Sequence, residues 1–201
     1  MIKSVCFIFL AFFLSSTLAS AQTRLPAGQD LPKVENYEIE ETLVRLSPIR
    51  FLPDHPLYFL LALKEKVDHF TKPDKTAKAL FDAHLSGKKI KEAYLLSQKN
   101  KFGDAQKSLK NYQKVGQRLR DELTQAASQG LPVFEIESLL ADNLVRHLKI
   151  IIVLVPKSPD QDFKQELSKS LESAVEIGKL LEKHLPDAKE RILDLAEKVK
   201  I

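Results

Sequence analysis

Five histidines are the residues of this sequence with the widest range of possible chemistry: His55, His69, His84, His147 and His184. None has a glutamate three positions before it, so the Glu-x-x-His step of di-iron helical bundles is missing. There is no His-Glu-x-x-His motif and no closely spaced histidine pair, so zinc has no local binding motif. A metal site could come only from histidines that are distant in the sequence, and that alternative stays open.

Two of these histidines have an informative sequence context. Glu65 and His69 lie four positions apart, a spacing that predicts a hydrogen bond on the surface of one helix. His147 lies between apolar residues, which predicts a partly buried histidine with a hydrogen-bond partner, or alternatively a ligand. Both patterns favour a structural role over a catalytic one.

Other catalytic motifs are also missing. The glycines lack the spacing of a phosphate-binding loop or a nucleophile elbow. Acidic pairs such as Glu135 with Glu137, or Asp187 with Glu190, fall in expected first turns of helices, where a negative charge complements the helix dipole. We therefore predict that the protein is not an enzyme and has no catalytic, cofactor-binding or metal-binding residues.

The first residues predict export. Lys3 precedes a short apolar stretch, and Ala19-Ser20-Ala21 follows it, which is the pattern of a signal peptide over residues 1–21 with cleavage after Ala21. Cleavage would remove Cys6, the only cysteine, so the exported chain would have no disulfide and no transmembrane helix. The expected location is extracytoplasmic, either periplasmic or secreted, with an N-terminal anchor if the signal is retained. A net charge of +4 is too small to indicate nucleic acid binding.

Residues 22–51 are expected to form a flexible or extended lead-in, because proline and glycine interrupt them and they show little periodicity. For residues 37–51 the sequence allows two alternatives, an extended arm or a short helix. The next stretch, "LPDHPLYFLLALKEKV", predicts a helix start: Pro53 and Pro56 suit a first turn, and Asp54 or His55 could cap it.

Two long segments, about 74–99 and 103–128, carry apolar residues at alternating steps of three and four, as in a coiled coil. Folded back at Asn100-Lys101, they align Ile90 with Tyr112 and Leu80 with Leu123. The same register places Gly87 opposite Gly116, which predicts a close approach of the two backbones.

Further helices are expected over about 134–155, 160–184 and 187–200, the first ending in the apolar "HLKIIIVLVP". The prediction is an all-α helical bundle over residues 52–201, built on a long antiparallel α-hairpin and containing about six helices. A disordered lead-in is expected before it.

The chain resembles a bacterial extracytoplasmic family, domain of unknown function 5667, over roughly residues 52–185. The resemblance is carried by Pro53, Asp54, Pro56, Leu57 and Tyr58, by Glu65, and by Lys89, Ile90, Glu92 and Ala93 on the following helix. The later "NLVRHLKIIIVLVP", which contains His147, is similar to a frequent companion segment. Leu61, where the family is usually basic, and Gly87 depart from the pattern. The resemblance implies a secreted, helical, non-enzymatic protein.

Basic residues on the hairpin suggest a partner. The hypothesis is that eight lysines form a strip that touches anionic envelope polymer or lipid headgroups. The alternative is an ordinary solvated helix face. The eight lysines are Lys88, Lys89, Lys91, Lys99, Lys101, Lys107, Lys110 and Lys114.

The expected function is that of an exported structural or interaction protein of the cell envelope, whose partner is an unknown protein or an anionic polymer. One alternative is a small-ligand or metal-binding bundle that uses His84 or His147. Another is a periplasmic chaperone-like protein with an exposed "IIIVLV" segment.

Overall fold

Seven α-helices build the described part of the chain. The computed structural model describes residues 36–199, with side chains from residue 38. The helices are α1 (Asn36–Arg45), α2 (Tyr58–Phe70), α3 (Lys75–Gln98), α4 (Phe102–Ser128), α5 (Phe134–Leu154), α6 (Gln161–Lys179) and α7 (Pro186–Glu197), and short 3₁₀ turns follow α5 and α6 at Val155–Lys157 and Leu180–Lys183. No strand occurs in residues 36–199. The predicted all-α class is confirmed; the expected signal peptide lies outside the described residues.

Local signals in the sequence set the helix ends. The side chains of Asp74 and Asp160 accept hydrogen bonds from backbone N–H groups three residues later, at 2.7 and 2.8 Å, and so cap α3 and α6. Pro186 begins α7, where its missing N–H would have had no partner. Gly130, with a φ of 69°, follows α4 in the left-handed conformation that glycine favours.

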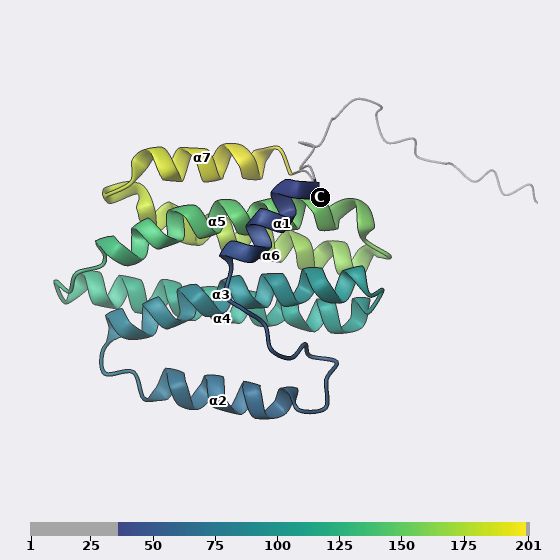
Figure 1. Cartoon of the computed structure of the whole chain (residues 1–201). Helices are drawn as coiled ribbons and strands as arrows, with labels where there is room; N and C mark the ends of the chain where they lie inside the picture. The colour runs from purple at the N-terminus through teal and green to yellow at the C-terminus, as the bar shows by residue number, and fades with distance from the viewer. Residues whose placement is uncertain (1–35, 200–201) are drawn as a thin grey trace, which may run out of the picture. The chain divides into compact units, whose positions relative to one another are not determined.

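The predicted hairpin of α3 and α4 forms the centre of the fold (Figure 1). Ile90 and Tyr112 are fully buried in one shared cluster, as their alignment predicted. Leu123 is buried as well, but Leu80 is 41% exposed, so the predicted seam does not extend fully to the open end of the hairpin.

Gly87 and Gly116 make room for other elements and not for each other. A Cβ atom added to Gly87 would lie 3.0 Å from Cδ2 of Leu46 and 3.3 Å from Nε2 of His147. At Gly116 it would lie 2.5 Å from the hydroxyl oxygen of Ser173 on α6. The predicted Gly–Gly crossing is therefore corrected: each glycine admits a side chain from a neighbouring segment.

The remaining long helices cover the hairpin. In Figure 1, α5 and α6 form a layer beside α3 and α4, and α7 packs on the outer side of α5 and α6. The segment Ile150–Val155 is mostly buried, with Ile150, Ile151 and Leu154 inaccessible to solvent. Among the described residues, no helix is sufficiently long and apolar to span a membrane.

Helical structure begins before residue 52. Of the two alternatives for residues 37–51, the structure has a short helix, α1, which packs on α5 and buries Ile39. Leu46, just after α1, joins the core between α3 and α5. Part of the expected lead-in is therefore attached to the bundle.

Candidate functional site

Helix α2 has the reverse of the usual amphipathic arrangement. It runs along the edge of the bundle beside α3 (Figure 1), and none of its residues is buried. Five of its apolar side chains point outward, while Leu61 and Ala62 are partly buried. These five form a stripe that we call the α2 ridge: Phe59 (63% exposed), Leu60 (50%), Leu63 (58%), Val67 (52%) and Phe70 (83%). Its polar side chains Tyr58, Glu65 and His69 reach toward the hairpin. A polar layer therefore lies under α2, where a core would be expected.

The first half of this layer is a tyrosine–lysine cluster, made of Tyr58, Glu65, Lys88, Lys89 and Glu92. The ammonium group of Lys89 donates to the Tyr58 hydroxyl at 2.8 Å and to Glu65 at 2.9 Å. Tyr58 donates in turn to Glu92 at 2.8 Å, and Lys88 pairs with the second oxygen of Glu65. Two cations and two carboxylates thus neutralise each other in a largely dry space.

Burial shifts the titration of this cluster. Removal from water raises the pKa of Glu92, which is fully buried, although Lys89 opposes that shift. Burial and the adjacent negative charge of Glu92 raise the pKa of the Tyr58 hydroxyl far above its usual range. Tyr58 therefore remains a neutral donor, which is what its hydrogen bond to the Glu92 carboxylate requires.

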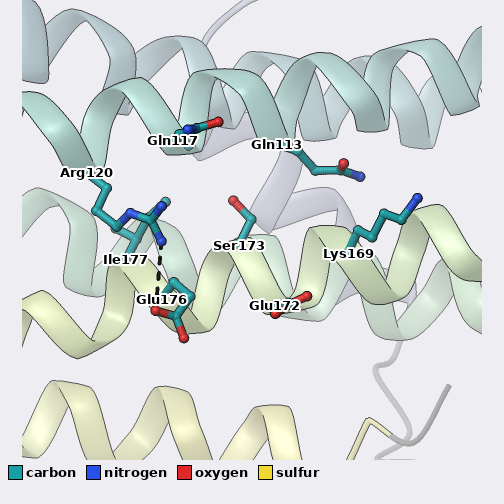
Figure 2. Close-up of a pocket in the computed structure, with 9 residues that line it drawn as sticks. Gln113, Gln117, Arg120, Lys169, Glu172, Ser173, Glu176 and Ile177 are labelled. Carbon is teal, nitrogen blue, oxygen red and sulfur yellow. Dashed lines mark ion pairs between the residues drawn. The ribbon is translucent and has the colours of Figure 1, made fainter.

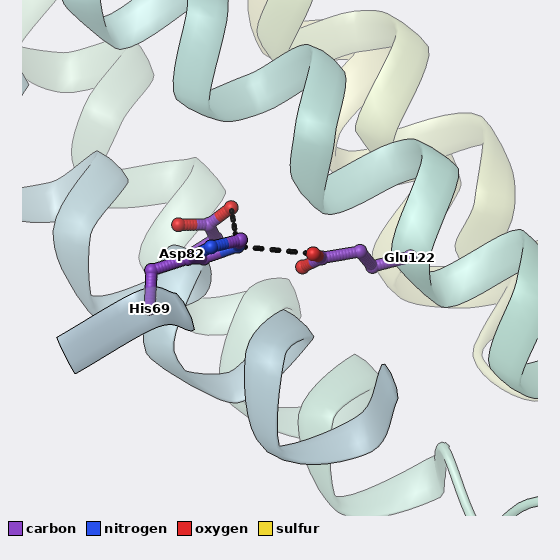
Figure 3. Close-up of side chains that lie close together, drawn as sticks. All are labelled: His69, Asp82 and Glu122. Carbon is purple, nitrogen blue, oxygen red and sulfur yellow. Dashed lines mark hydrogen bonds and ion pairs between the residues drawn. The ribbon is translucent and has the colours of Figure 1, made fainter. Parts of the chain in front are cut away.

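The second half is a histidine–carboxylate cluster of His69, Asp82, Arg118 and Glu122, and Figure 3 shows how three of these side chains converge from α2, α3 and α4. Nε2 of His69 lies 3.0 Å from Glu122 and 3.5 Å from Asp82. Arg118 donates two hydrogen bonds to Asp82, at 2.7 and 3.0 Å. Asp82 is fully buried and Glu122 is 6% exposed.

The histidine–carboxylate cluster is electrostatically incomplete. Burial raises the pKa of the Asp82 carboxyl, against the lowering effect of Arg118. Burial and the charge of Asp82 raise the pKa of Glu122. One oxygen of Glu122, Oε2, is buried and has no hydrogen-bond partner among the described residues. Arg118 is bonded to Asp82 only, and Lys75 lowers the pKa of Glu122 by its charge without forming an ion pair with it in the described residues.

Comparison with known proteins identifies one matching family. The family model described as domain of unknown function (DUF5667) matches residues 50–200. The chain belongs to this family. No curated protein and no solved structure matches the chain.

The segments that suggested DUF5667 from the sequence now have a structural explanation. Tyr58, Glu65, Lys89 and Glu92 are four of the five members of the tyrosine–lysine cluster. Asp54, from the same first segment, forms an ion pair with Lys101 at 2.7 Å, at the tip of the hairpin. These residues attach the segment from Asp54 to Glu65 to the hairpin, so part of the resemblance lies in the contacts that dock α2.

The expected surface pair of Glu65 with His69 does not form. Each side chain contacts a different partner on the hairpin, the lysines for Glu65 and the carboxylates for His69. The sequence did place both residues on one helical face. It gave no indication that this face, and not the apolar one, would point inward.

The other histidines are separate from this site. His147 is fully buried, with Nδ1 3.2 Å from the Tyr112 hydroxyl, so the expected partner exists. Burial, aided by the charge of Arg146, lowers the pKa of His147 to about 3, and the imidazole stays neutral. His84 is exposed. Within residues 38–199, neither His84 nor His147 belongs to a group of three metal-ligating side chains.

The predicted lysine strip is interrupted. Lys88 and Lys89 are buried in the tyrosine–lysine cluster, and Lys91 donates to the backbone carbonyl of Leu43 at 2.6 Å. Lys101 and Lys107 pair with aspartates, at 2.7 and 2.9 Å. Lys88 and Lys89 therefore form ion pairs inside the fold, and the eight lysines do not form one continuous external surface.

A groove between α4 and α6 is a weaker candidate. Figure 2 shows polar side chains from both helices along it, and its volume is about 220 Å³. Glu176, on its wall, pairs with Lys179 at 2.7 Å and lies 3.8 Å from Arg120. The buried side-chain atoms without a partner in the described region lie elsewhere. The layer under α2 is therefore the stronger candidate.

Proposed function

We propose that this DUF5667 protein is an exported, non-catalytic interaction protein of the cell envelope, and that it binds anionic membrane surfaces through the α2 ridge. The observation that carries the proposal is the outward orientation of all five large apolar side chains of the ridge. Large exposed apolar patches with polar borders typically mark a binding surface. The proposal keeps the anionic partner that the sequence suggested, but it moves the contact from the lysine strip to the α2 ridge.

The ridge supplies the apolar contribution to binding. Apart from the adjacent Phe59 and Leu60, its side chains follow each other at steps of three and four residues, so they form one stripe along α2. Each is half exposed or more, and its burial in an acyl layer would contribute on the order of 1 kcal/mol. A helix that lies in the membrane plane and inserts one apolar face needs this arrangement.

Basic residues on both sides of the ridge favour an anionic surface over a neutral one. Lys66 lies on one flank, in a hollow that Lys114 of α4 also lines. Lys64 and Arg50 lie on the other flank. Lys66, Lys114 and Arg50 form no ion pair within the described residues, whereas Lys64 pairs with Asp68. Each cation near an anionic leaflet adds about 1 kcal/mol.

The polar layer beneath α2 supports the same function. Because the inward contacts are ion pairs and hydrogen bonds with fixed partners, α2 cannot easily rotate to bury its apolar stripe. Rotation would turn Tyr58 and Glu65 out to solvent. Lys89 and Glu92 would then stay buried without these partners, which is energetically costly. The tyrosine–lysine cluster therefore holds the ridge outward.

The experiment is vesicle co-sedimentation of the chain from Gln22 onward, with phosphatidylglycerol or phosphatidylcholine vesicles. We expect binding to the anionic vesicles that weakens as salt rises, and little binding to the neutral ones. The double substitution Phe59→Ser with Leu63→Ser should reduce binding at least tenfold. Phe134→Ser is the matched control, because Phe134 is 56% exposed but lies on α5.

Two outcomes would contradict the proposal. One is equal sedimentation of the ridge variant and the parent protein. The other is a ridge-dependent dimer in light scattering without vesicle binding, which would assign the ridge to a second copy of the chain. Export is tested separately, by mass spectrometry of the protein from the native cell: a mature chain that begins at Gln22 is expected.

A further inference from the structure

The histidine–carboxylate cluster has the composition of a metal site. His69, Asp82 and Glu122 each offer one ligand atom, and these three atoms lie within 4.8 Å of one another. They come from three different helices, so no sequence motif could have revealed them. Figure 3 shows the three side chains directed at a common point between α2 and the hairpin.

The unpartnered oxygen of Glu122 is a second and independent indication. Glu122 is 6% exposed, and its Oε2 atom finds no donor among the described residues, while Oε1 faces His69. A buried acceptor without a partner is unfavourable, and buried carboxylates normally pair with a cation or bind a metal. Arg118 is already engaged by both oxygens of Asp82. A bound cation would give this unpartnered oxygen a partner.

The ligand types indicate the class of ion. One imidazole nitrogen and two carboxylate oxygens suit zinc or manganese, whereas calcium and magnesium prefer oxygen ligands alone. Arg118 would hold the Asp82 carboxylate in place by its two hydrogen bonds, as outer partners of metal ligands commonly do. Three protein ligands would leave at least one coordination position for water.

We propose that His69, Asp82 and Glu122 bind one divalent transition-metal ion, which ties the C-terminal end of α2 to the hairpin. Because only His69 belongs to α2, the ion would cross-link α2 to two residues that the hairpin already holds together. Metal binding would then stabilise the docked position of α2. The proposal is independent of membrane binding, since it concerns the inner face of the helix.

Isothermal titration of the chelator-treated chain with Zn²⁺ and with Mn²⁺ at pH 7.5 tests this site. We expect one ion per chain for at least one of the two metals, and a higher melting temperature in its presence, with Mg²⁺ causing no change. Glu122→Gln and His69→Gln should each weaken binding at least tenfold. His55→Gln and His184→Gln are the controls, because these histidines lie outside the cluster.

A spectroscopic measurement distinguishes binding at this site from unspecific effects of metal on stability. Co²⁺ titrated into the parent protein should give visible absorption bands that Glu122→Gln diminishes and His55→Gln leaves intact. Absence of saturable Zn²⁺ or Mn²⁺ binding below millimolar concentration would overturn the proposal. So would binding that both cluster variants retain at full affinity.

Discussion

Glu65→Gln is the substitution that tests most directly how α2 is attached. Glu65 pairs with both Lys88 and Lys89, whose side chains are 11% and 5% exposed. The neutral amide would leave two nearly buried ammonium groups with Glu92 as their remaining carboxylate. Removing one partner of a buried pair costs about 3 kcal/mol or more.

We do not expect the full cost of an unpaired buried charge here, because α2 can detach from the hairpin. None of its residues is buried, so the helix can lift away and allow the lysines to become hydrated. Since Glu92 remains, we expect the docked position of α2 to lose about 2 kcal/mol. A change of 1.4 kcal/mol is tenfold in an equilibrium constant, so about 2 kcal/mol corresponds to a roughly 30-fold higher population of the opened state.

Amide hydrogen exchange followed by mass spectrometry measures this opening segment by segment. The peptide that contains α2 should exchange roughly 30 times faster in Glu65→Gln. The rest of the domain should keep its folded spectrum. Asp68→Asn is the matched control on the same helix: it removes only the exposed pair with Lys64, which is worth less than about 1 kcal/mol. Unchanged exchange in α2, or loss of the folded spectrum of α3 to α6, would refute this account.

Three further predictions concern the core and the helix ends. Burial lowers the pKa of His147 to about 3, from about 6.5 in the unfolded chain, so only the unfolded chain takes up a proton as the pH falls from 7.5 to 5.5. This uptake lowers the free energy of unfolding by about 1.4 kcal/mol. Urea denaturation of His147→Leu should lack that loss. Gly178→Ala should destabilise by about 1 kcal/mol, because the new Cβ would lie 2.9 Å from Cγ2 of buried Ile192, whereas Gly103→Ala, with open space around it, should stabilise by about 0.5 kcal/mol in the same melts. Asp160→Ala should cost about 1 kcal/mol by removing the cap of α6, and an unchanged melting temperature would contradict that role.

The sequence by itself determined most of the helices and the hairpin. Asp74 and Asp160 mark helix starts because a short acidic side chain reaches the free N–H groups of a first turn, wherever the helix packs. The pairing of Ile90 with Tyr112 followed from the helical period and a short connection, which together leave one antiparallel register. These features depend on neighbours in the chain, and so they can be derived without coordinates.

The tertiary structure decided which face of α2 points inward. The helical period groups Tyr58, Glu65 and His69 on one side of α2, but it does not say which side meets the protein. That choice depends on buried partners from α3 and α4 that lie 13 to 53 positions away in the sequence, the separations of His69 from Asp82 and from Glu122. The candidate site arises from that choice, because charges scattered along the sequence become a neutralising layer only when the packing of helices brings them within hydrogen-bonding distance.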